Sequence, residues 1–166
     1  MNNSYPMLDE RKKIISWSLY DWANSTFSTT VMAGFFPIFF QQYWSTASEV
    51  TVSTWYLGLA NSIASITVAS LAPFLGAIAD KASVKKRLLI FFAFIGIIST
   101  GSLSMIGQGY WRLAALFYVI ASIGFMSANI FYDSLLPSVA SKQKRDFVSS
   151  LGYSLGYIGG GVFFFF

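Results

Sequence analysis

The sequence contains no cysteine and no histidine, and both absences narrow its chemistry. Without cysteine there is neither a disulfide framework nor a thiolate metal site, and the redox compartment stays undecided. Without histidine, the usual imidazole metal ligand and the side chain that titrates near neutral pH are both missing. The familiar catalytic triads and zinc sites therefore cannot be assembled, and no glycine-rich Walker loop is present. We expect a protein that is not an enzyme and holds neither a metal nor a cofactor.

Charged residues are also scarce, at 11% of the 166 residues, whereas hydrophobic residues make up 55%. A soluble domain carries about 25% charged residues, so this chain has too few to cover a globule that faces water. The mean hydropathy of +0.57 points the same way. The composition therefore predicts an integral membrane protein whose main partner is the lipid bilayer.

Five apolar runs qualify, or begin to qualify, as transmembrane helices, which need about 20 apolar residues each. They cover roughly residues 14–40, 54–79, 88–107, 113–136 and 148–166. The fifth run meets the last residue in the stretch GGGVFFFF, with no polar or basic residue after it. We therefore expect residues 1–166 to be an incomplete N-terminal transmembrane half of a multi-pass protein. Such an incomplete chain could arise in three ways: as a fragment, from a mispredicted reading frame, or from a frameshift in the Phe163–Phe166 codons.

The basic residues predict the orientation of the chain in the membrane. Ten of the eleven lie before the first run or in the connections after the second and fourth runs, and only Arg112 lies on the other side. The ten are Arg11, Lys12, Lys13, Lys81, Lys85, Lys86, Arg87, Lys142, Lys144 and Arg145. The N-terminus is thus predicted to be cytoplasmic, in the plasma (inner) membrane. The net charge of +4 then reflects topology rather than a nucleic-acid partner.

Polar residues interrupt the first run in a regular pattern. Asp21, Asn24, Ser25 and Ser28 are spaced i, i+3, i+4 and i+7, so an α-helix would place them on one face. A carboxylate in hydrocarbon costs about 2.5–3.5 kcal/mol, so this face should meet a bundle interior or a water-filled cavity. Alternatively, Asp21 makes a packing hydrogen bond between helices or lies at the headgroups.

The fourth run carries a second polar stripe. Ser122, Met126, Asn129 and Asp133 follow at i, i+4, i+7 and i+11, and Asn129 would lie at nearly the depth of Asp21. The two stripes together predict a shared cavity in the cytoplasmic half. The alternative for Asp133 is that its side chain simply snorkels to the interface.

Small residues form two further rows, which are typical of close helix packing. In the second run the row is Gly58, Ser62, Ser65, Ala69, Ala72 and Gly76. In the fifth run it is Gly152, Gly156 and Gly160. Asn61 lies off the first row and is a weaker candidate for the cavity.

Several stretches resemble a known transporter group. The stretch GAIADKASVKKRLL resembles the motif between the second and third helices of major facilitator transporters. The stretches LYDWANSTFSTTVMAGFFPIFF, ANIFYDSLLP and SLGYSLGYIGGG are similar to the "unknown major facilitator" family. Its fungal relatives are autophagy-related vacuolar effluxers of amino acids. The resemblance extends from about Trp17 to Gly161.

The resemblance implies a twelve-helix bundle of two halves, each built from inverted three-helix repeats. It implies a permease that moves small polar solutes, amino acids by analogy, through alternating access, with the C-terminal half as the missing partner. Cavity or gate roles fall to Asp21, Asn24, Asn129 and Asp133, joined by Ser28 and Asn61. A charged latch would comprise Gly76, Asp80, Lys81, Lys85 and Lys86. The fourth run lacks the arginine that many proton-coupled relatives carry, so the coupling ion stays open.

Two other function classes remain open at this point. An intramembrane aspartyl protease would need two neighbouring carboxylates, but the Gly-x-Gly-Asp motif of that class is missing. A non-transporting protein is the other alternative, either a truncated remnant or a small oligomer assembled through the Gly152–Gly160 row.

Overall fold

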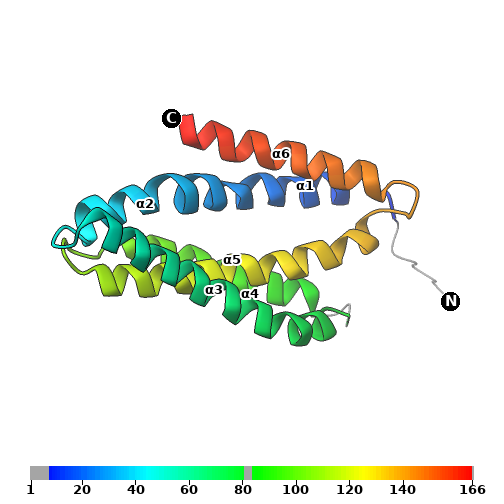
Figure 1. Ribbon diagram of the computed structural model, residues 1–166. Helices are drawn as coiled ribbons and strands as arrows, with labels where there is room; N and C mark the ends of the chain where they lie inside the picture. The colour runs from blue at the N-terminus through cyan, green and yellow to red at the C-terminus, as the bar shows by residue number, and fades with distance from the viewer. Residues whose placement is uncertain (1–7, 81–83, 166) are drawn as a thin grey trace. The chain divides into compact units, whose positions relative to one another are not determined.

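The computed structural model describes residues 8–80 and 84–165, and all regular elements within those ranges are helical (Figure 1). The chain begins with one continuous helical stretch that alternates between α and π geometry. It comprises α1 (Arg11–Thr26), the π-helix η1 (Phe27–Phe35), α2 (Phe36–Phe39) and the π-helix η2 (Phe40–Trp44). Four long helices follow: α3 (Val50–Ala79), α4 (Lys85–Leu103), α5 (Trp111–Val139) and α6 (Arg145–Phe165).

Three of these helices, α3, α4 and α5, are long and apolar enough to cross a membrane. They coincide with the second, third and fourth predicted runs, with ends that differ by a few residues. For example, α4 stops at Leu103 rather than at residue 107, because the Ser104 amide turns back to the Gly101 carbonyl (3.2 Å). The first and fifth runs fall in the Arg11–Trp44 stretch and in α6, and their crossing of the membrane stays a prediction.

Several hydroxyl groups on α3 are satisfied within their own helix. Thr67 donates to the Ile63 carbonyl (2.7 Å), and Ser70 donates to the Ile66 carbonyl (2.8 Å). Such bonds to the carbonyl four residues earlier remove the cost of an unpaired hydroxyl in hydrocarbon. Exposed serines and threonines on α3 are therefore compatible with a lipid environment.

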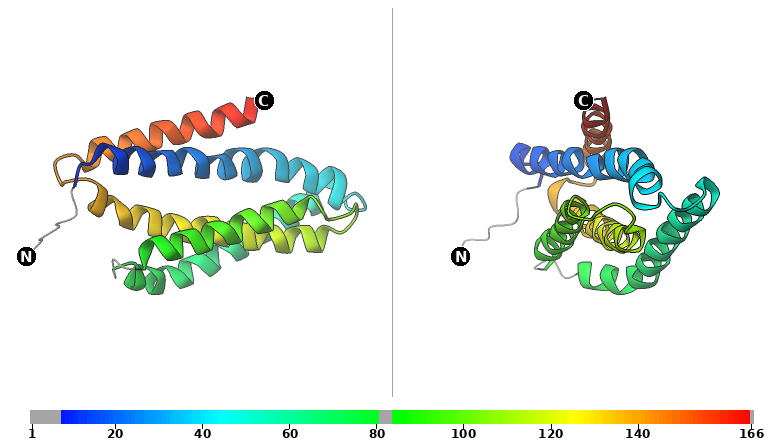
Figure 2. Two further views of the ribbon diagram at one scale, coloured as in Figure 1. Left: turned by 180° about the vertical axis from the view of Figure 1, so that it is seen from behind. Right: turned by 90° about the vertical axis from the view of Figure 1, so that its left-hand side faces the viewer.

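The chain divides into two compact units. The first unit joins the chain up to Met32 with the chain from Tyr132 onward, and the second comprises Ala33–Phe131. In the first unit, α6 runs along α1, so helices from the beginning and the end of the sequence lie side by side (Figure 1; Figure 2, left).

Glycines on α6 bring it close to α1 in the first unit. Gly152, Gly156, Gly159 and Gly160 are all buried. A Cβ at Gly159 would collide with the carbonyl oxygen of Trp22, and one at Gly160 would lie 2.5 Å from the Thr29 hydroxyl. The Gly152–Gly160 row therefore packs against α1 within this chain.

The second unit holds its helices together through a glycine contact and an apolar cluster. A Cβ at Gly124 of α5 would lie 2.7 Å from the backbone nitrogen of Gly96 on α4. Leu75, Ala79 and Phe131 form a buried cluster, and the ring of Phe92 stacks on Phe131 with centroids 5.8 Å apart.

Two contacts fix the end of the first helical stretch in the second unit. The buried ring of Phe36 stacks on Tyr118 of α5 at 3.9 Å between centroids. The indole of Trp44 donates to the Ile106 carbonyl (3.1 Å) in the connection between α4 and α5.

The small-residue row predicted on α3 does not pack against another helix among the described residues. Gly58 and Ser62 are exposed, and no described atom lies within 4 Å of a Cβ built at Gly58 or Gly76. The buried side chains of α3 lie on another face, at Ser53, Ala60, Ala64, Val68, Leu75 and Ala79. Valine and leucine bury more apolar area than glycine and serine, so that face is the one drawn into the unit.

Candidate functional site

The two Tyr-Asp pairs of the sequence come together in the first unit. The ring of Tyr132 stacks on Trp17 with centroids 4.3 Å apart and on Tyr20 at 5.0 Å. The Trp17 indole also donates to the Tyr132 carbonyl (3.2 Å). These contacts fix the end of α5 against α1. Asp21 and Asp133 directly follow Tyr20 and Tyr132 in the chain, so they are held in the same region. We call Trp17, Tyr20, Asp21, Tyr132 and Asp133 the Tyr–Asp cluster.

The Tyr–Asp cluster combines carboxylates with buried hydroxyls. Tyr132 is only 5% exposed, Asp21 is half-buried and Asp133 is exposed. The two carboxylates lie within electrostatic reach of each other and of the Tyr132 phenol. The hydroxyls of Tyr20 and Tyr132 are buried and make no hydrogen bond within the described part of the chain. Because buried polar atoms are normally paired, this cluster has donor and acceptor capacity left for a polar solute.

The polar stripe of α1 faces the glycines of α6. A Cβ at Gly156 would lie 2.7 Å from the Ser25 hydroxyl oxygen and 3.1 Å from Oδ2 of Asp21. A Cβ at Gly152 would lie 3.1 Å from the Tyr132 hydroxyl. Asp21 therefore lies at a tight contact between helices. This geometry is also what the helix-packing alternative for Asp21 requires.

The other predicted cavity residues are placed as follows. Asn24 and Asn129 are half-buried, but Asn129 belongs to the second unit, so a depth shared with Asp21 stays a prediction. Ser28 donates to the Ser25 carbonyl (2.9 Å) within its own helix. Asn61 accepts a hydrogen bond from the Tyr118 hydroxyl (2.9 Å), which ties α3 to α5.

The predicted charged latch is only partly described. The Asp80 amide donates to the Gly76 carbonyl (3.1 Å) at the end of α3, and the Asp80 side chain is exposed. Lys85 is half-buried at the start of α4, and Lys86 beside it is exposed. Lys81 lies outside the described residues, so the latch stays a prediction. Among residues 8–80 and 84–165, no group of three acidic side chains could hold a metal ion.

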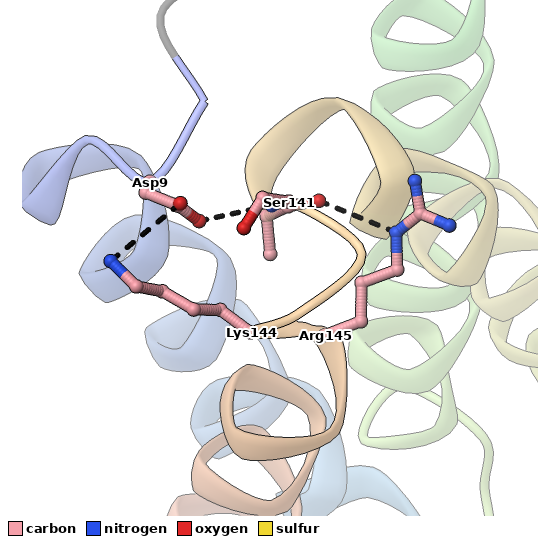
Figure 3. Close-up of polar contacts among 5 residues, drawn as sticks. Asp9, Ser141, Lys144 and Arg145 are labelled. Atoms are coloured by element: carbon pink, nitrogen blue, oxygen red, sulfur yellow. Dashed lines mark hydrogen bonds and ion pairs between the residues drawn. The ribbon is translucent and has the colours of Figure 1, made fainter.

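The structure also shows a tie that the sequence analysis missed, at the start of the first unit (Figure 3). The Ser141 amide donates to Oδ1 of Asp9 (2.9 Å), and Lys144 lies 3.6 Å from Oδ2. The Asp9 amide in turn donates to the Val139 carbonyl (3.0 Å). Asp9 has a φ of 63°, which aspartate tolerates better than most residues.

This tie has an electrostatic signature. The Ser141 amide, helped by the Lys144 ammonium, holds the pKa of Asp9 below its ordinary value of 3.8. The Arg145 guanidinium donates to the Ala140 carbonyl (3.3 Å) and braces the same turn. Sequence reasoning had assigned Lys144 and Arg145 to orientation alone. The only signal was an aspartate just before the first helix.

The long apolar helices define an all-α membrane protein. The chain belongs to the family described as "Vacuole effluxer Atg22 like", which matches residues 9–166. It is 43% identical over 148 residues to YxiO of Bacillus subtilis (strain 168), an uncharacterized MFS-type transporter; the match covers 87% of this chain and 34% of YxiO. The predicted resemblance to major facilitator transporters is thereby confirmed.

Two further relatives are more distant. One is an uncharacterized protein of Aquifex aeolicus (strain VF5), 28% identical over 150 residues, covering 90% of this chain and 36% of that protein. The other is autophagy-related protein 22 of Coccidioides immitis (strain RS), 25% identical over 182 residues, covering 81% and 30%. The chain thus spans about a third of the length of these relatives. No solved structure matches it.

Proposed function

We propose that this N-terminal portion of an MFS-type transporter serves to move small polar solutes, with amino acids as the substrate class, by alternating access. The observation that carries the proposal is the Tyr–Asp cluster. Its carboxylates and buried phenols come from α1 and α5, the helices that hold the two predicted polar stripes. The family to which the chain belongs is named for an effluxer, which supports the transport role.

The chemistry of the cluster suits a solute that donates hydrogen bonds. A carboxylate accepts from an ammonium or a hydroxyl, and a phenol both donates and accepts. A carboxylate within a membrane helix is costly and is a functional candidate by default. Asp21 would bind the solute or gate its path, with Asn24, Ser28 and Asp133 in supporting roles.

The test is Asp21→Asn in the full-length transporter. The substitution keeps the size and removes the charge, so we expect solute flux to fall at least about tenfold while the amount of protein in the membrane is unchanged. Asp146→Asn, an exposed aspartate in the first turn of α6, is the matched control and should transport normally. Normal flux in Asp21→Asn would remove this residue from the mechanism and leave the packing alternative.

The proposed topology places the N-terminus in the cytoplasm of a cell whose plasma membrane holds the protein. Residues 1–166 contain no cysteine, so single cysteines placed among them can report it once any cysteine elsewhere in the full-length protein is replaced. In intact cells, a membrane-impermeant maleimide should label Gln108→Cys and spare Lys142→Cys. The reverse pattern would overturn the orientation.

A further inference from the structure

Basic residues from two distant segments gather at the end of the first unit where α1 and α6 begin. The segments are held together by the Asp9 tie, whose partners Asp9 and Ser141 are 132 residues apart (Figure 3). We call this region the basic end. Its basic residues are Arg11, Lys12, Lys13, Lys142, Lys144 and Arg145.

The basic end keeps an excess of positive charge after its internal ion pairs are counted. Its three acidic residues are Asp9, Glu10 and Asp146. Asp9 pairs with Lys144, and Glu10 pairs with Lys13 at 2.9 Å. Arg11, Lys12 and Lys142 are exposed and form no ion pair with the described residues. These three cations are therefore available to an external anion.

Apolar side chains are exposed next to these charges. Leu8 is 44% exposed, Ile15 is 42% exposed and Phe147 is 68% exposed. An exposed apolar side chain beside lysines suits the boundary between acyl chains and headgroups. A soluble anion would use the charges but would gain nothing from the apolar neighbours.

We infer that the basic end is a binding site for anionic phospholipid headgroups. Clusters of four to eight basic residues at the cytoplasmic end of a membrane helix attract anionic lipids. If these residues only set the orientation of the chain in the membrane, their number near each span would matter but their arrangement in space would not. The Asp9 tie does more, because it fixes residues 11–13 and 142–145 as one group around a shared turn. This inference does not depend on the proposed transport function.

The test compares lipid binding by charge variants of the purified full-length protein. The detergent-solubilised protein is titrated with short-chain phosphatidylglycerol or phosphatidylcholine, and bound lipid is followed by native mass spectrometry. We expect tighter binding of phosphatidylglycerol, and we expect the K12Q/K142Q variant to bind it at least about tenfold more weakly. The matched control is K86Q/R87Q, which removes two exposed charges at the start of α4. Equal weakening in both variants, or equal affinity for the two lipids, would overturn the site.

Asp9→Asn separates a built site from diffuse attraction. Removing this acidic residue makes the region more positive, so diffuse attraction predicts tighter binding of phosphatidylglycerol. Loss of the tie predicts weaker binding, which is our expectation, and tighter binding would refute it. An excess of inorganic phosphate should leave the lipid bound, because phosphate lacks the acyl chains. Displacement by phosphate would show a simple anion site and would also refute the inference.

Discussion

A single methyl group at Gly159 should break the packing of α6 against α1. In the structure a Cβ built there collides with the carbonyl oxygen of Trp22 and lies 2.7 Å from Cδ1 of the same residue. The carbonyl belongs to the backbone of α1, so it cannot rotate away as a flexible side chain would. Gly159→Ala therefore forces the two helices apart along their shared face.

The size of the effect follows from two opposing terms. Overpacking a close contact costs about 1–3 kcal/mol. Replacing glycine with alanine inside a helix returns up to about 1 kcal/mol. With the full helix gain, the net expectation is a loss of about 0–2 kcal/mol in the free energy of unfolding, which is at most a factor of about 30 in the folded to unfolded ratio.

The assay is chemical unfolding of the purified protein in detergent, followed by tryptophan fluorescence. Gly58→Ala is the matched control, because it makes the same change inside α3 where no described atom lies within 4 Å of the new methyl. It should leave stability unchanged or raise it slightly. A Gly159→Ala variant as stable as Gly58→Ala would refute the close contact between α1 and α6.

Three further outcomes follow from single contacts. Trp17→Phe should keep the ring stack on Tyr132 but lose the indole hydrogen bond, which lowers the free energy of unfolding by about 1 kcal/mol in the same assay; an unchanged value would contradict that bond. Tyr118→Phe should cost about 0.5–1.5 kcal/mol, and Asn61→Ala should cost less in that variant than in the wild type, because the Tyr118–Asn61 bond is already broken and only the Asn61 bond to the Leu57 carbonyl is left to lose. The contribution of the Asp9 tie to the free energy of unfolding should depend on pH, because the tie lowers the pKa of Asp9. That contribution is complete above the ordinary pKa of 3.8 and is lost as the pH falls through the lowered pKa of the folded protein. The difference in melting temperature between wild type and Asp9→Asn should thus be constant from pH 5 to 8 and shrink as the pH falls below 3.8, and a difference that does not shrink would contradict the tie.

The long apolar runs predicted α3, α4 and α5 well, because length and hydropathy suffice to identify such helices. In the first run, the prediction of which residues share a helix face assumed 3.6 residues per turn throughout. That geometry holds to Thr26, and η1 then continues as a π-helix from Phe27. A π-helix bonds to the fifth residue along, so the α-helical spacing no longer assigns faces from Phe27 onward.

Contacts between distant segments could not be predicted from spacing at all. The glycine row on α6 indicated a close neighbour, but the sequence did not say that α1 was the neighbour. The Asp9 tie joins one aspartate to the backbone amide of Ser141, and such a bond produces no periodic pattern in the sequence. On α3, a similar row of small residues gave the same signal, yet the structure buries a different face.

The distance along the chain between α1 and α6 has a consequence for biosynthesis. Ser141 follows Asp9 by 132 residues, and α6 begins only after that. At about 5–20 residues per second, the ribosome needs roughly 7–26 s to make this interval. The contact between α1 and α6 cannot form before then. Until the ribosome has passed Gly156, Asp21 lacks the glycine that packs against it in the finished chain.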